Sequence, residues 1–65
     1  MSTNTLMEHL YKDVELAYWD EASEEHIIYT GRLIDIEDRC QCITIKNNND
    51  IIILDISKID QLFFN

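Results

Sequence analysis

The sequence predicts a mainly β protein, a small antiparallel barrel of about five strands with a short helix at the amino terminus. Three observations favour this fold. Apolar and polar residues alternate over most of the chain after Val14, which is the period of a β-strand. A helical spacing of apolar residues is confined to the first part of the chain. With no proline and one glycine, the 65 residues are not a flexible linker, and they suffice for a single domain over 1–65.

A short helix is predicted over about 5–12. Thr5 is followed three residues later by Glu8, which makes a capping box for the amides of a first helical turn. Apolar residues at helical spacing follow, at Leu6, Met7, Leu10 and Val14. Because so short a helix is marginal in water, we expect its apolar side to cover the sheet.

The first two strands are predicted over about 14–19 and 26–37. In the first strand one face carries Val14, Leu16 and Tyr18, and the other carries Glu15, Ala17 and Trp19. The acidic run "DEASEE", Asp20 to Glu25, joins the two strands as a hairpin connection. In the second strand one face is predicted to carry Ile27, Tyr29 and Leu33, and the other Ile28, Ile34 and Ile36.

Gly31 lies inside the second predicted strand, between its two apolar sets. A glycine there marks a bend, a bulge or a close backbone approach, and a bent strand can serve both halves of a barrel. Further strands are predicted over about 41–46, 51–56 and 59–63, with a tight turn at "NNND". The apolar run "IIILDI" indicates partial burial on both faces of its strand or an exposed edge that a partner covers.

This order of a helix and about five strands, with a glycine at the bend of the second, resembles SH3-like and Sm-like small barrels. The segment "ELAYWDEASEEHIIYTGRLIDIEDRCQCITIKNNNDIIILDISKIDQL" is similar to the bacterial YolD-like family. The matching features are an aromatic first strand, a G-x-[IL] bend, an isoleucine-aspartate step and a closing D-I-x-x-I, here Tyr18, Gly31-Arg32-Leu33, Ile36 and Asp55-Ile56-Ser57-Lys58-Ile59.

A second similarity is to the Rof family of small acidic modulators of Rho-dependent transcription termination, which have an Sm-like barrel behind a helix. Their G-x-A-x-D and L-D-x-I patterns are echoed by Gly31 to Asp35 and by Leu54-Asp55, although Leu33 stands where a small residue is usual. An RNA-binding Sm protein would have an asparagine beside its third strand and an arginine-glycine pair after its fourth. Gln41 and Leu54 to Ile56 replace them, so the resemblance implies a bacterial or phage barrel without that RNA site.

Charge limits the partners of the protein. Thirteen acidic and five basic residues give a formal net charge of −8, which repels nucleic-acid phosphates and anionic membranes. Direct nucleic-acid or membrane binding is therefore disfavoured. The charge either keeps a small protein soluble or forms an acidic face that docks a basic protein.

Two acidic groups are the candidate partner-binding residues: Asp20, Glu21, Glu24 and Glu25 in the first, and Asp35, Glu37 and Asp38 in the second. If the loops that carry them lie at one end of a barrel, they form a single negative patch. Trp19 lies on the face opposite Val14, so we expect an exposed aromatic anchor beside the first group. The alternative is two solvated loops.

Catalytic and metal sites are not predicted. The chain has no glycine-rich phosphate loop and no serine elbow motif, and its carboxylates are scattered, so we expect no enzyme and no cofactor. Cys40 and Cys42, with His9 and His26, do not form the two tightly spaced ligand pairs of a zinc site. We predict free, packing thiols, since neighbours two apart on a strand are not placed to bridge easily.

The amino-terminal "MSTNTLMEHLYKD" lacks the pattern of a signal peptide, so we expect a cytoplasmic protein. Two hypotheses of function remain. The first is a non-enzymatic regulator or inhibitor that binds a basic, nucleic-acid-handling protein and competes with its nucleic acid. The alternative is a self-assembling Sm-like structural barrel that forms a homo-oligomer when its "IIILDI" edge pairs with a second copy.

Overall fold

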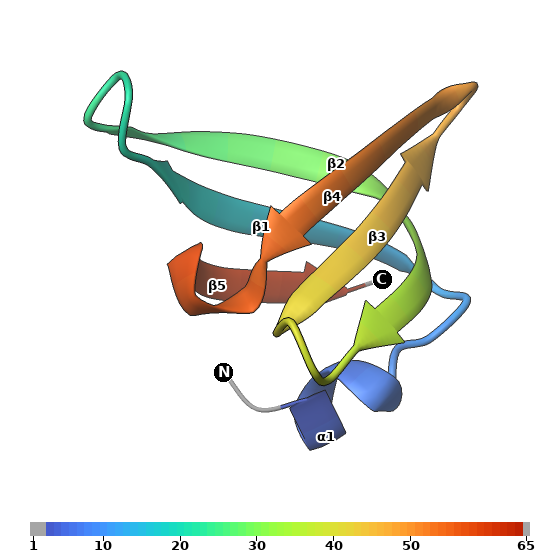
Figure 1. The fold of residues 1–65 in the computed structure, drawn as a ribbon. Helices are drawn as coiled ribbons and strands as arrows, with labels where there is room; N and C mark the ends of the chain where they lie inside the picture. The colour runs from blue at the N-terminus through green and yellow to red at the C-terminus, as the bar shows by residue number, and fades with distance from the viewer. Residues whose placement is uncertain (1–2, 65) are drawn as a thin grey trace.

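In the computed structural model, which describes residues 3–64, one sheet of five antiparallel strands follows a short helix (Figure 1). The elements, in chain order, are α1 (Thr3–Met7), β1 (Asp13–Asp20), β2 (Glu25–Glu37), β3 (Cys42–Asn47), β4 (Asp50–Asp55), the 3₁₀ turn η1 (Ile56–Lys58) and β5 (Ile59–Phe64). The predicted mainly β fold with an amino-terminal helix is confirmed.

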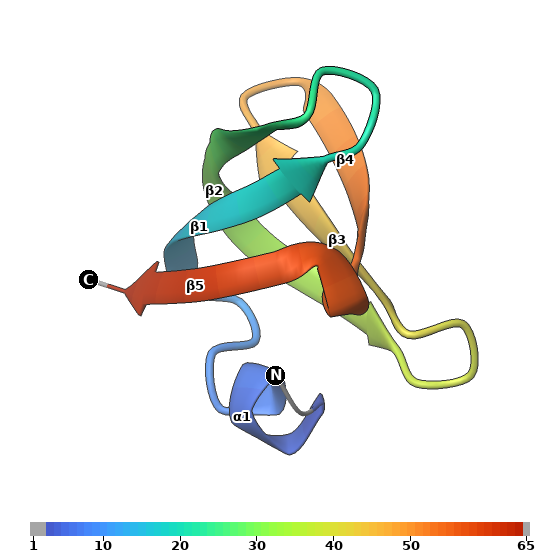
Figure 2. The same cartoon turned by 90° about the vertical axis from the view of Figure 1, so that its left-hand side faces the viewer.

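The strand order in the sheet is β4-β3-β2-β1-β5. Three hairpins connect β1 to β4 in sequence, and η1 then redirects the chain so that β5 pairs with β1 on the side away from β2. The sheet bends strongly, and β3 and β4 pass across β1 and β5 (Figure 2). Within residues 3–64 no ladder joins β4 to β5, so the sheet is open and its closure into a barrel is not confirmed.

The helix begins and ends earlier than predicted, and Thr5 lies within it rather than at its N-cap. The helix ends early because the segment after it forms backbone hydrogen bonds with β2. Tyr11 takes a left-handed conformation with φ of 68°, and its amide donates to the carbonyl oxygen of Leu33 at 2.6 Å. The amide of Leu33 donates in turn to the carbonyl oxygen of Lys12 at 3.0 Å. Backbone groups of Tyr11 and Lys12 that a longer helix would need are therefore bonded to Leu33 of β2 instead.

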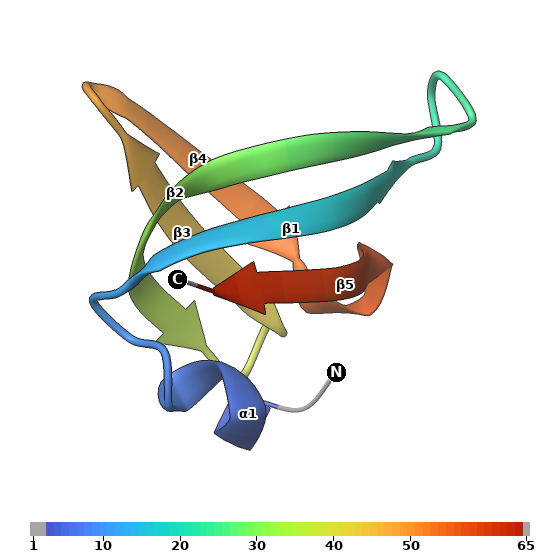
Figure 3. The ribbon, with the colours of Figure 1, turned by 180° about the vertical axis from the view of Figure 1, so that it is seen from behind.

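The core lies in the hollow of the bent sheet, with α1 across one end of it (Figure 3). Leu6 of α1 is fully buried there and anchors the helix to the core. Burial of one such leucine contributes about 1.5–3 kcal/mol. Among the described residues the other buried apolar side chains of this cluster are Val14, Leu16, Leu33, Ile43, Ile45, Leu54, Ile56 and Ile59.

A bulge in β2 changes which residues share a face. The register between β2 and β3 shifts between Leu33 and Asp35, which leaves Ile34 as the extra residue. Leu33 is buried and Ile36 packs against the same core. The prediction that Leu33 and Ile36 lie on opposite faces is therefore wrong, because a bulge breaks the two-residue period.

Gly31 allows β2 and β3 to approach closely. Its φ is 158°, and a Cβ atom placed on it would lie 2.7 Å from the carbonyl oxygen of Lys46, closer than real Cβ contacts. That oxygen belongs to the backbone of β3, so no side-chain rotation could relieve the clash. A close backbone approach, one of the predicted roles of this glycine, is thus its role here.

Candidate functional site

The β1–β2 hairpin carries the first predicted acidic group, and part of this group holds the turn together. The Asp20 carboxylate accepts a hydrogen bond from Ser23 Oγ at 2.7 Å, and this bond is the main reason that the pKa of Asp20 is below its ordinary value. Glu24 closes the turn in a left-handed conformation, with φ of 54°. Glu21 Oε1 lies 3.5 Å from Lys58 Nζ.

Asp60 of β5 joins this group, which the sequence did not reveal. Its carboxylate pairs with the ring of His26, across the β1 strand that separates β2 from β5. We call Asp20, Glu21, Glu24, Glu25 and Asp60 the hairpin cluster. The side chains of Glu24 and Glu25 are exposed and, in the described part of the chain, make no hydrogen bond or ion pair.

Trp19 is half-buried rather than fully exposed. Its indole meets the edge of the His26 ring, with 5.0 Å between the ring centroids. The predicted anchor therefore lies at the base of the hairpin cluster with only part of its surface free. The alternation pattern of β1 did not predict this partial burial, because the His26 ring that covers Trp19 belongs to the next strand.

The second acidic group is separated from the first. Asp20 and Glu25 flank the hairpin at one end of β2, whereas Glu37 ends β2 at its other end (Figure 1). Glu37 Oε1 accepts the amide of Arg39 at 3.0 Å, within the β2–β3 turn. The condition for a single patch, that both loops lie at one end of the molecule, is therefore not met, because Asp35 and Glu37 lie in the part of β2 far from the hairpin.

The β2–β3 turn also carries both cysteines. They are free thiols, and Cys40 is exposed while Cys42 is half-buried. The prediction that both are packing residues is wrong for Cys40, which lies in the turn instead of a strand. Cys42 Sγ lies 3.3 Å from the carbonyl oxygen of Cys40. The Cys40 thiol is the largest cause that raises the pKa of Cys42 to about 11.

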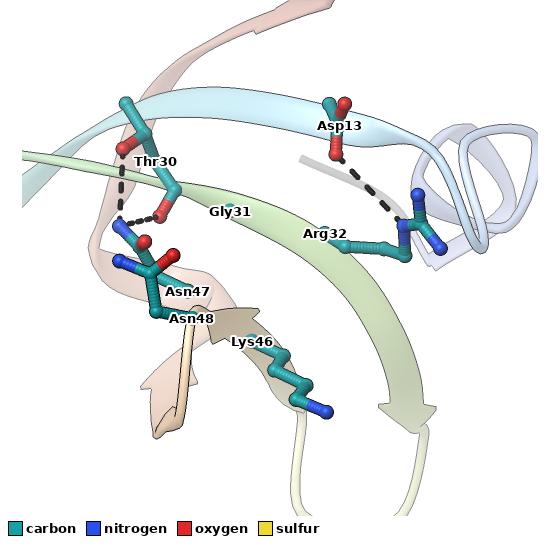
Figure 4. Close-up of a pocket in the computed structure, with 7 residues that line it drawn as sticks. All are labelled: Asp13, Thr30, Gly31, Arg32, Lys46, Asn47 and Asn48. Carbon is teal, nitrogen blue, oxygen red and sulfur yellow. Dashed lines mark hydrogen bonds and ion pairs between the residues drawn. The ribbon is translucent and has the colours of Figure 1, made fainter.

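A polar depression of about 360 Å³ surrounds Gly31 (Figure 4). Asn47 Nδ2 donates to the carbonyl oxygen of Thr30 at 3.0 Å, and Arg32 Nε lies 3.9 Å from Asp13 Oδ1. None of the lining side chains is buried, so nothing would exclude water from a ligand. No motif in the sequence marks this depression, which is lined by Asp13, Thr30, Gly31, Arg32, Lys46, Asn47 and Asn48.

The edge strand β4 exposes apolar side chains. Ile51 and Ile53 are 55% and 69% exposed, although they alternate with Ile52 and Leu54, which pack on the core. Of the two readings of "IIILDI", the structure therefore supports the exposed edge. Within residues 3–64 no group of three metal-ligating side chains is found, and no helix has both the length and the apolar character to cross a bilayer.

Comparisons with known proteins assign no relative to the chain. No protein-family model, no curated protein and no solved structure matches it. The similarities to the YolD-like and Rof families therefore stay predictions from short motifs.

Proposed function

We propose that the protein is a non-enzymatic acidic regulator that binds a basic, nucleic-acid-handling protein through the β1–β2 hairpin. The observation that carries this proposal is the hairpin cluster. It gathers five carboxylates from two separate parts of the chain, and Lys58 and His26 are the basic side chains that contact it among the described residues. The partly free surface of Trp19 lies at its base.

The charge of the cluster favours a basic protein surface as its partner. Complementary charges steer association. Their attraction weakens as salt is added, because the screening length is only about 8 Å at physiological ionic strength. A protein surface that binds nucleic-acid phosphates presents clustered lysine and arginine side chains. An acidic hairpin seated on such a surface would compete with the nucleic acid there.

The carboxyl groups with shifted pKa values support a binding role over catalysis. In residues 3–64 these are Asp20 and Asp55, and hydrogen bonds from Ser23 and Ser57, respectively, lower both pKa values. A general acid at neutral pH needs the opposite shift, toward a pKa near 7. These two carboxylates stabilise turns, as Asp55 does where it accepts the Ser57 amide at 2.9 Å.

The triple variant Glu21→Gln, Glu24→Gln, Glu25→Gln neutralises three carboxylates of the hairpin cluster. We expect it to raise the Kd for the partner at least about tenfold, a loss of about 1.4 kcal/mol in binding free energy. The matched control removes the same charge elsewhere, with Glu8→Gln, Asp35→Asn and Asp50→Asn, and should stay within about threefold of the unmodified protein. The tagged protein first captures its partner from nuclease-treated lysate. Calorimetry with the purified partner, at low and high salt, then gives the affinities.

Equal losses in the two triple variants would mean that net charge alone attracts the partner. Full affinity in the hairpin variant would exclude the hairpin as the interface. Competition is tested separately, by adding the protein to a complex of the partner with its nucleic acid. Displacement that the hairpin variant cannot produce is the expected result.

A second function, self-assembly through β4, is favoured by the exposed side chains of Ile51 and Ile53. An apolar edge strand with unpaired backbone groups is a template for another strand. In residues 3–64, β5 forms the other edge of the same sheet, and its Phe63 and Phe64 are each 49% exposed. This alternative requires no basic partner.

Assembly through this edge predicts that Ile53→Lys converts an oligomer into a monomer, because a lysine would have to be buried in the new contact. The matched control is Ile28→Lys, since Ile28 is an isoleucine that is 55% exposed but lies on β2, away from the edge strand β4. Light scattering after size exclusion gives the mass of each variant at low and high salt. A monomeric unmodified protein at high concentration would rule this alternative out.

A further inference from the structure

The β2–β3 turn brings the Cys42 thiol back to the backbone of Cys40, which an extended strand would not do. Residues two apart on a strand are separated by about 6.6 Å, from a rise of about 3.3 Å per residue. Here Gln41, between the two cysteines, has φ of 54°, the left-handed conformation of a turn. The chain therefore reverses at Gln41, and Cys42 Sγ comes back to within 3.3 Å of the Cys40 carbonyl oxygen.

Hydrogen bonds at this turn hold that arrangement. The carbonyl oxygen of Gln41 accepts the amide of Ile56 at 2.8 Å, and Gln41 Nε2 donates to the carbonyl oxygen of Asp38 at 2.6 Å. Cys42 itself pairs with Asp55 in the β3–β4 ladder. The fold therefore fixes the backbone on both sides of the pair, which lowers the entropy that closing a ring between them would cost.

We propose that Cys40 and Cys42 form a redox-active dithiol, which low-molecular-weight disulfides such as glutathione disulfide oxidise to an intramolecular Cys40–Cys42 disulfide. The Cys40 thiolate attacks one sulfur of the oxidant, forms a mixed disulfide and releases one glutathione thiolate. The Cys42 thiolate then attacks Cys40 Sγ and releases the second. The two cysteines lose two protons and two electrons, and one glutathione disulfide becomes two glutathione molecules.

The exposures of the two thiols assign their roles. Cys40 is exposed, so the oxidant reaches it first, whereas Cys42 is half-buried beside it. The raised pKa keeps Cys42 protonated at neutral pH and makes it a poor first nucleophile. The Cys40 thiol is the largest cause of this raised pKa, and that cause disappears once Cys40 is in a mixed disulfide. The second step is thereby favoured by the first. This inference does not depend on the proposed partner.

Mass spectrometry of the purified full chain, after incubation with glutathione disulfide at mildly alkaline pH, tests the proposal. The expected main product is lighter by about 2 Da, the mass of the two hydrogens lost. Cys42→Ser should instead accumulate a mixed disulfide heavier by about 305 Da. Cys40→Ser should form its adduct at least about tenfold more slowly, since only the half-buried thiol remains.

A comparison with the protein in concentrated urea separates the effect of the fold from that of the short spacing. If the folded turn preorganises the pair, the mixed disulfide should close faster in the native protein than in the unfolded one, by at least about tenfold. Equal or slower closure in the native state overturns the proposal. So does a native protein that accumulates only the heavier adduct, or that forms disulfide-linked dimers.

Discussion

Gly31→Ala should destabilise the protein by about 2–4 kcal/mol, an effect that combines overpacking against β3 with backbone strain. An added Cβ would lie 2.7 Å from the carbonyl oxygen of Lys46, and the φ of 158° is one that side chains rarely adopt. Relief requires β2 to move away from β3, where Arg32 pairs with Lys46. Urea denaturation followed by circular dichroism measures the change in the free energy of unfolding.

The neighbouring Arg32→Ala variant is the control for this substitution. Arg32 is exposed, and its distance of 3.9 Å to Asp13 marks a weak ion pair at the surface. Its loss should change the unfolding free energy by at most about 0.5 kcal/mol. If Gly31→Ala proves as mild as this control, the close approach of the two strands is not a constraint on residue 31.

Leu33→Ala should cost about 2–5 kcal/mol, the range for a cavity left by a buried leucine. Leu33 is fully buried at the β2 bulge, and its backbone also pairs with the segment that follows α1. A chain of 65 residues has a total stability of only about 3–10 kcal/mol. We therefore expect the melting temperature to fall by more than about 10 °C.

The matched control for the cavity is Ile53→Ala, which also truncates a branched aliphatic side chain, but at a position that is 69% exposed. Its unfolding free energy should change by no more than about 0.5 kcal/mol. Comparable losses at both positions would mean that β4 is covered in solution. That result would support assembly through the edge, and size exclusion of the same samples would reveal it.

The strands were predictable because their signal is local. Alternation that begins at Val14 matches a strand with a buried face, and Val14 and Leu16 are buried while Glu15 between them is exposed. The end of the helix was not predictable in the same way. Tyr11 and Lys12 follow a capping signal, yet their backbone groups bond to Leu33, which is distant in the sequence. Tertiary pairing here overrides a local propensity.

The two acidic groups illustrate the limits for the candidate site. The sequence identified the carboxylates but could not decide whether they meet, because that depends on the length of β2 between them. It also could not show that Asp60 pairs with His26, a contact made over β1 by strands at distant positions in the chain. By contrast, the spacing of Asp20 and Ser23 is a local turn signal that the sequence contains.

The strand order β4-β3-β2-β1-β5 also has a consequence for biosynthesis. The hairpins from β1 to β4 join neighbours in the sequence, so they can form as soon as they leave the ribosome. β5 pairs with β1, the first of the five strands to be made, and β5 is made after the other four. Until then the outer edge of β1 stays unpaired and available to other nascent chains. The fifth strand of the sheet therefore protects the outer edge of the first.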